Sequence, residues 1–142
     1  MFLGQYFHTV DEKGRITIPA AFRDVFVDGA YIVQGFDKNL RLLTEPVFEA
    51  MAEKVISMSE TQPKIRKLKR LIFSNSGRVE LDSLGRVLVP QFLRDFAELK
   101  NEVVIVGVGN AIEIWSQPAW QGQLNDLSDS EANAQQYAEH DL

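Results

Sequence analysis

An arginine placed directly after a tight turn is the feature of this chain best suited to binding a ligand. Asp11, Gly14 and Arg15 form an Asp-x-x-Gly-Arg segment. The aspartate can accept hydrogen bonds from turn amides, and the glycine tolerates positive φ, so both residues suit a turn. The turn does not require an arginine next. A guanidinium offers five donors in a planar fork, which can hold a phosphate or the O6/N7 edge of guanine through two bonds.

The same segment returns 71 positions later as Asp82, Gly85 and Arg86. Each copy runs on through a short apolar stretch to a proline, Pro19 in the first and Pro90 in the second. A match of this length indicates two related structural units. We therefore predict two arginines projecting from equivalent turns at the rim of a sheet.

The two turns differ in charge, and each arginine has an alternative role. Lys13 adds a second cation to the first turn, where the second turn has Leu84. Each arginine could instead pair with its own aspartate and only stabilise the turn. The repeat favours a binding role, although a purely structural repeat would preserve the same pattern.

The sequence gives little support for catalysis. The only histidines are His8 and His140, and neither lies near a serine or cysteine in a motif. No His/Asp/Glu cluster has metal-binding spacing. Residues 103–112 begin like a dinucleotide fingerprint, but Ile112 occupies the position of the third small residue, so a hairpin turn is the better interpretation. We predict no enzyme activity, cofactor, metal or small-molecule substrate.

Charge is unevenly distributed along the 142 residues. The net charge is −5, yet residues 1–75 carry 11 Lys and Arg against 9 Asp and Glu. Residues 121–142 contain five acids and no base. Residues 64–70 contain five cations and no acid, which indicates either the solvated face of an amphipathic helix or a surface that attracts phosphate. An acidic tail on a more basic body is compatible with nucleic-acid binding.

The surrounding elements follow the repeat. Strands are expected at 2–10, 15–18, 31–35 and 40–43, and again at 73–81, 86–89, 103–108 and 112–115. Short helices after Pro19 and Pro90 should end near 27 and 99, and longer helices are expected at 46–58, 64–71 and 118–127, with Thr44 and Ser116 as N-caps. The tail beyond 127 lacks a core pattern and is expected to fray. Each repeat of about 50 residues is near the lower limit for independent folding, so the two should share one core.

These residues resemble the MraZ family of bacterial transcriptional regulators. The grounds are the opening Met-Phe-Leu-Gly-x-Tyr, the two Asp-x-x-Gly-Arg turns with their prolines, and the helical connector between them. The resemblance implies a mainly β, α+β fold in which two AbrB/SpoVT-like swapped hairpins interlock as a barrel. It divides the chain into a first repeat at 1–53, a connector at 54–72, a second repeat at 73–120 and an acidic tail at 121–142.

The resemblance also implies a function. Members of the family are expected to be cytoplasmic, nucleoid-associated repressors of the division and cell wall gene cluster. They would bind G-rich direct repeats in double-stranded DNA upstream of their own promoter, as homo-oligomeric rings of about eight or twelve copies. The residues carried over are Arg15, Arg86 and Lys13 for DNA binding, and Asp11, Gly14, Asp82 and Gly85 for loop structure. A protein-interaction module, such as an antitoxin, is the alternative that the acidic tail favours.

Overall fold

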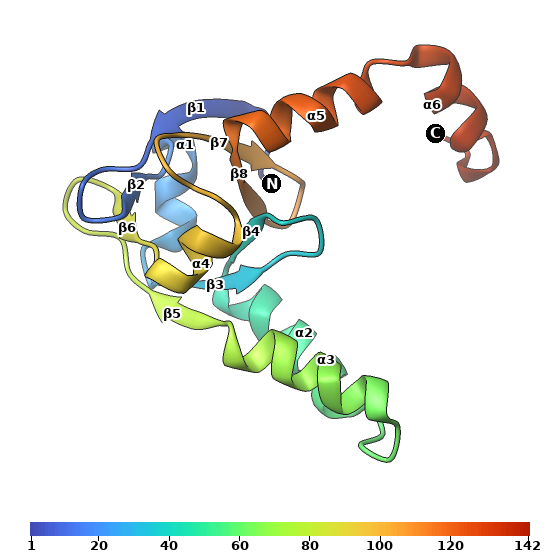
Figure 1. Ribbon diagram of the computed structural model, residues 1–142, viewed down its shortest axis with the longest axis horizontal. Coiled ribbons are helices and arrows are strands. Elements are labelled where there is room, and N and C mark those ends of the chain that lie inside the picture. The colour runs from blue at the N-terminus through green and yellow to red at the C-terminus, as the bar shows by residue number, and fades with distance from the viewer.

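Two antiparallel sheets form the centre of the computed structural model, which describes residues 1–142 (Figure 1). The strands are β1 (Gln5–Thr9), β2 (Arg15–Thr17), β3 (Ala30–Gln34), β4 (Leu40–Leu43), β5 (Gly77–Val79), β6 (Arg86–Leu88), β7 (Glu102–Gly107) and β8 (Ile112–Ser116). The helices are α1 (Ala20–Arg23), continued by a 3-10 turn at Asp24–Phe26, α2 (Glu45–Ile56), α3 (Pro63–Ser74), α4 (Gln91–Phe96), α5 (Gln117–Leu127) and α6 (Ser130–Gln136). The predicted α+β class is confirmed.

Strands are exchanged between the two repeats. The larger sheet has the order β1-β7-β8-β4-β3-β5, so β1 of the first repeat pairs with β7 of the second. In the same way, β5 of the second repeat pairs with β3 of the first. The smaller sheet consists of β2 and β6, again one strand from each repeat. The predicted interlocking of two hairpin repeats is therefore confirmed.

The structure does not show the closed barrel of the expected fold. The six-stranded sheet is open, with β1 at one edge and β5 at the other. β2 and β6 pair with each other and do not extend it. Within the first repeat, β1 and β2 are joined only by a bridge between Val10 and Ile16. The strands predicted at 15–18 and 86–89 therefore do not form hairpins within their own repeats. They pair with each other and form a two-stranded ribbon that joins the repeats.

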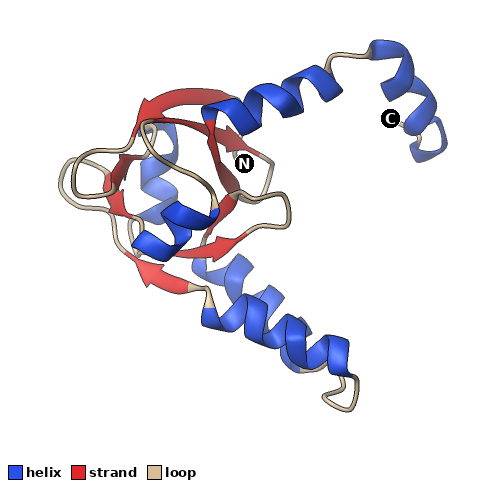
Figure 2. Cartoon of the chain, viewed as in Figure 1, coloured by secondary structure: helices blue, strands red, loops and turns tan.

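One core of 18 buried side chains is built from both repeats. Alternation along each strand divides the side chains between two faces of the sheet, as the pleat requires. On β7, for example, Val103 and Ile105 enter this core, whereas Val104 and Val106 face the opposite side. Helices α1 and α4 close the core face, while α2 and α5 cover the other face. Figure 2 shows the helices on both sides of the strands.

Three local expectations need correction. Helix α3 extends to Ser74, so the strand predicted at 73–81 is shortened to Gly77–Val79. The tail predicted to fray contains α6, which has no buried residue. The Asp129 carboxylate caps this helix by accepting a hydrogen bond from the amide of Ala132. Ser116 caps α5 as predicted, but Thr44 makes no capping bond to α2. No helix has the length and apolar character needed to cross a membrane.

Candidate nucleic-acid interface

The ribbon of β2 and β6 presents both motif arginines on one outward face. Ile16 faces Val87 across the ribbon, and both side chains are fully buried in the core. The flanking positions must therefore point outward. Their cross-strand pairs are Arg15 with Leu88 and Thr17 with Arg86. The exchange of strands thus brings together two arginines that lie 71 positions apart in the sequence.

The loop before Arg15, here called the first tip (residues 11–14), is organised by one carboxylate. Asp11 Oδ1 accepts hydrogen bonds from the amides of Lys13 and Arg15, both at 2.9 Å. Its Oδ2 accepts a bond from Arg15 Nε at 2.7 Å. The amide of Gly14 donates to the Asp11 carbonyl at 3.0 Å, and Gly14 has a φ of 83°. The first tip is therefore a closed turn that holds its arginine at a fixed angle.

The second tip (residues 82–85) repeats this geometry. Asp82 Oδ1 accepts bonds from the amides of Leu84 and Arg86 at 3.0 and 2.9 Å, and Oδ2 accepts from Arg86 Nε at 2.8 Å. Gly85 has a φ of 76°. In Figure 1 both tips project on the side of the molecule away from the α2–α3 pair and from α5 and α6.

Both motif arginines pair with their own aspartates, as expected if each arginine stabilises its turn. The pairing uses only Nε, and neither Arg15 nor Arg86 gives a hydrogen bond from its Nη groups to another protein atom. About a quarter of each arginine side chain is exposed: 28% for Arg15 and 27% for Arg86. Pairing and ligand binding are therefore compatible, since the aspartate orients the guanidinium and leaves its outer edge open.

The tip carboxylates are stabilised in their charged form. The amide of Arg15, followed by its guanidinium, lowers the pKa of Asp11 below its usual 3.8. The amide and side chain of Arg86 lower the pKa of Asp82 in the same way. Hydrogen bonds to a carboxylate favour ionisation. Both aspartates are thus anionic at neutral pH and keep their bonds to the tips.

Two further arginines support the tips from the opposite repeat. A Cβ added to Gly14 would lie 1.4 Å from Nη1 of Arg94, so the guanidinium of α4 packs directly on the first tip. Arg94 Nη1 also donates to the Val89 carbonyl at 2.7 Å, and the Val89 amide donates to the Gly14 carbonyl at 3.0 Å. The first tip is therefore held by the second repeat.

The reciprocal contact holds the second tip. A Cβ on Gly85 would lie 2.3 Å from Nε of Arg23, and this nitrogen donates to the Ile18 carbonyl at 2.8 Å. The Ile18 amide donates to the Gly85 carbonyl at 2.8 Å. Sequence reasoning assigned no role to Arg23 or Arg94. The sequence does contain a sign of their shared role, because they occupy equivalent positions of the two repeats, in Phe-Arg-Asp and Leu-Arg-Asp.

His8 lies on β1, near the second tip's supporting arginine. Burial lowers the pKa of its imidazole, and the positive charge of Arg23 lowers it further. Its side chain is therefore neutral at pH 7 and adds no cation to this surface.

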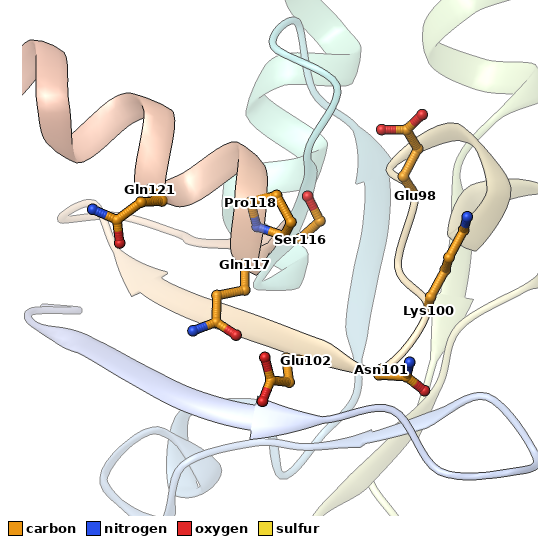
Figure 3. A pocket seen from close by; sticks show the side chains of 8 residues that line it. All are labelled: Glu98, Lys100, Asn101, Glu102, Ser116, Gln117, Pro118 and Gln121. Atoms are coloured by element: carbon orange, nitrogen blue, oxygen red, sulfur yellow. The ribbon is translucent and has the colours of Figure 1, made fainter.

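The polar pocket in Figure 3 does not supply a catalytic arrangement. It has a volume of about 530 Å³ and is lined by Glu98, Lys100, Asn101, Glu102, Ser116, Gln117, Pro118 and Gln121. It contains no histidine or cysteine, and its only hydroxyl, that of Ser116, accepts the capping bond from Ala119. No group of three or more His, Cys, Asp or Glu residues is arranged to hold a metal ion.

The basic run on α3 is separated from the tips. Figure 1 places α3 on the other side of the molecule. Within this run, Lys69 Nζ pairs with Glu60 Oε1 at 3.1 Å and donates to the Ile56 carbonyl at 3.2 Å. Arg66 donates to the Glu60 carbonyl. Part of the run therefore fastens the connection between α2 and α3, while Lys64, Lys67 and Arg70 face solvent.

Comparison with known proteins identifies relatives along the whole chain. The model of the family described as "MraZ protein, putative antitoxin-like" matches twice, at residues 1–71 and 72–141. A protein of Herpetosiphon aurantiacus named Transcriptional regulator MraZ is 43% identical over 140 residues, which cover 99% of this chain and 96% of the relative. A protein of the same name from Roseiflexus castenholzii is 45% identical, and the match covers 98% of this chain and 95% of the relative. Another from Finegoldia magna is 41% identical, and the match covers 90% of each sequence.

Proposed function

The chain belongs to the MraZ family, and from this premise we propose that it is a transcriptional regulator that binds double-stranded DNA through the β2–β6 ribbon. One observation carries the proposal: two guanidinium groups lie on one outward face with their Nη edges free of protein partners. Arginine in this state can bind phosphate or the O6/N7 edge of guanine. Lys13, exposed in the first tip, adds a third cation.

The shape of the ribbon suits a duplex. A two-stranded antiparallel ribbon fits the major groove of B-form DNA, where each base pair presents a distinct pattern of donors and acceptors. Asp11 and Asp82 are assigned a structural role, because each is occupied by three hydrogen bonds within its own tip. Gly14 and Gly85 supply the positive φ that closes the tips.

Several copies of the chain must act together for tight binding. One ribbon carries few cations, and the net charge of −5 opposes approach to a polyanion. A homo-oligomeric ring of about eight or twelve copies, closed by a heterologous interface, multiplies the contacts. Such a ring would bind direct repeats spaced by about one helical turn, ~10 bp, upstream of its own promoter. Its action would be to repress the division and cell wall cluster, at the nucleoid in the cytoplasm.

Footprinting on the DNA upstream of the gene, followed by anisotropy titrations with the protected duplex, tests the proposal. We expect Arg15→Ala and Arg86→Ala each to weaken binding by about tenfold or more, because each removes a cationic contact worth roughly 1–3 kcal/mol. Arg70→Ala is the matched control, since this exposed arginine lies on α3, away from the tips. Native mass spectrometry of the same samples reports the assembly. Normal affinity in the Arg15/Arg86 double variant would refute the proposal.

A second candidate function is a protein-interaction module. Residues 121–142 hold five acids, no base and no buried side chain, so this segment is available to a basic partner. Purification from the native cell distinguishes the two functions. A stoichiometric protein partner that is lost when residues 128–142 are removed would favour the module, whereas retention of the upstream DNA favours the regulator.

A further inference from the structure

The outward face of the ribbon carries apolar groups as well as cations. Leu88 is 56% exposed and belongs to none of the buried clusters, although the residues before and after it in sequence, Val87 and Val89, are fully buried. In the second tip, Leu84 is 60% exposed. The equivalent positions of the first repeat hold Thr17 and Lys13. Isolated exposed leucines are common on protein surfaces, so the position of these two residues is what requires an explanation.

Each leucine lies beside one motif arginine. Leu88 is the direct cross-strand partner of Arg15. Cross-strand partners on one face have Cβ atoms about 5 Å apart. Leu84 lies two residues before Arg86 and donates its amide to the carboxylate that orients this arginine. One end of the ribbon therefore presents a guanidinium and an isobutyl group on the same face. At the other end, the tip that precedes Arg86 carries an exposed leucine.

We propose that Leu88, assisted at the other end of the ribbon by Leu84, contacts the C5-methyl group of thymine in the major groove. This inference rests on the proposed DNA binding and names the part of the sequence readout that arginine does not supply. The thymine methyl is the one methyl group that base pairs display in the major groove, and apolar side chains are its usual partners. Neighbouring base pairs are about 3.4 Å apart along the axis. With Arg15 on one base pair, Leu88 reaches the same or the adjacent pair.

The two halves of the ribbon then read different features. At the position of Leu88, the first repeat has Thr17, a partly buried residue with a hydroxyl. At the position of Leu84, it has Lys13, which suits phosphate. The second repeat therefore contributes the larger and more exposed apolar groups, whereas the first contributes an additional charge.

Replacing thymine by deoxyuridine in the footprinted duplex tests this inference, because the substitution removes only the methyl group. Each thymine is replaced in turn, and the affinity of the full-length protein is measured by anisotropy with the fluorescein-labelled duplex. We expect at least one position at which uracil weakens wild-type binding about 3- to 5-fold, the value of one lost methyl contact. Leu88→Ala should weaken binding to the thymine duplex by a similar factor and should not distinguish thymine from uracil at that position.

Leu127→Ala is the matched control, since Leu127 lies on α5 with 53% exposure. It should retain the wild-type preference for thymine. A thermal melt confirms that each variant is folded. Equal wild-type affinity for thymine and uracil at every position would overturn the inference while leaving the proposed function intact. Retention of the thymine preference by Leu88→Ala would also overturn it. Failure of the arginine variants to weaken binding would instead refute the DNA-binding function itself.

Discussion

At the scale of single residues, the tip aspartates explain how an arginine can be both paired and available. Asp11 uses Oδ1 for two amides and Oδ2 for Arg15 Nε. The four donors on the two Nη groups of this arginine make no hydrogen bond to another protein atom. A long side chain normally loses rotamer freedom when it binds. Here the tip has already restricted it, so less freedom remains to be lost in a complex.

Asp11→Asn separates this orienting role from simple charge. The asparagine carbonyl still accepts the amide bonds, but its NH₂ group cannot accept from Arg15 Nε. We expect DNA affinity to fall about 2- to 10-fold, because an oriented side chain becomes mobile. Removal of a negative charge alone would strengthen binding to a polyanion. Anisotropy at matched salt decides between the two effects, and tighter binding would show that Asp11 acts only as a charge. Asp82→Asn provides the parallel test at the second tip.

The lowered pKa values of Asp11 and Asp82 predict a dependence of stability on pH. Because these groups bind protons less readily in the folded state, the unfolded chain takes up protons first as the solution is acidified. Their contribution is fully present above the usual value of 3.8 and is lost as the pH falls through the folded-state pKa. Urea unfolding at a series of pH values from about 5 to 2.5 measures this dependence. The free energy of unfolding should fall more steeply with decreasing pH for wild type than for the double variant Asp11→Asn/Asp82→Asn. If the free energy of unfolding depends on pH in the same way in both proteins, the two aspartates are not the source of the pH dependence.

At the scale of elements, each tip depends on a helix from the other repeat. Arg94 of α4 packs on Gly14, and Arg23 of α1 packs on Gly85. Both arginines also hydrogen-bond backbone carbonyls next to the ribbon. The positive φ favours glycine at both positions, and a Cβ there would also displace the guanidinium.

A series of glycine-to-alanine variants separates these two requirements. Gly122 in α5 has open space around it, so its replacement should raise the free energy of unfolding by up to about 1 kcal/mol. Gly109 also has open space but a φ of 90°, so its replacement should lower stability by about 1–2 kcal/mol. Gly14→Ala adds displacement of Arg94 and should lower stability by roughly 1 kcal/mol more than Gly109→Ala. Urea titrations measure all three, and equal effects at positions 14 and 109 would show that Arg94 gives no support.

The elements that local patterns specify were predicted well, and those that depend on distant partners were not. The strand at 40–43 was predicted with its observed bounds, because turn residues precede it and Thr44 follows it. The predicted helix ends at 71 and the predicted strand begins at 73, whereas α3 continues to Ser74. Periodicity cannot assign the short apolar run at 71–73. The pairing of β2 with β6 and the contact of Arg94 with Gly14 join segments more than 65 residues apart, which no local pattern encodes.

At the scale of the whole molecule, the two repeats form one folding unit. The buried core takes side chains from both, and both sheets contain strands from both. Neither repeat alone can satisfy the backbone donors and acceptors of its own strands. The resemblance to known proteins predicted this exchange, but the open edges at β1 and β5 became visible only in the structure.

Separate expression of residues 1–71 and 72–142 tests this dependence. Neither fragment should be a folded monomer, because β1 and β5 would lack their partners β7 and β3. Mixing the two should restore the far-ultraviolet spectrum and the fluorescence of Trp115 and Trp120, which are buried against β1 and β7. A fragment that sediments as a monomer and shows dispersed amide resonances would contradict a shared core.

The unlike ends of the ribbon have a consequence for how the molecule lies on a duplex. A pair of identical subunits has a twofold axis, so a rotation about this axis leaves the surface that faces DNA unchanged. Fusing two halves that differ at Lys13 and Leu84, and at Thr17 and Leu88, removes that axis. The two ends of the chain's ribbon are therefore distinguishable, and neighbouring copies on one stretch of DNA would all bind in the same orientation.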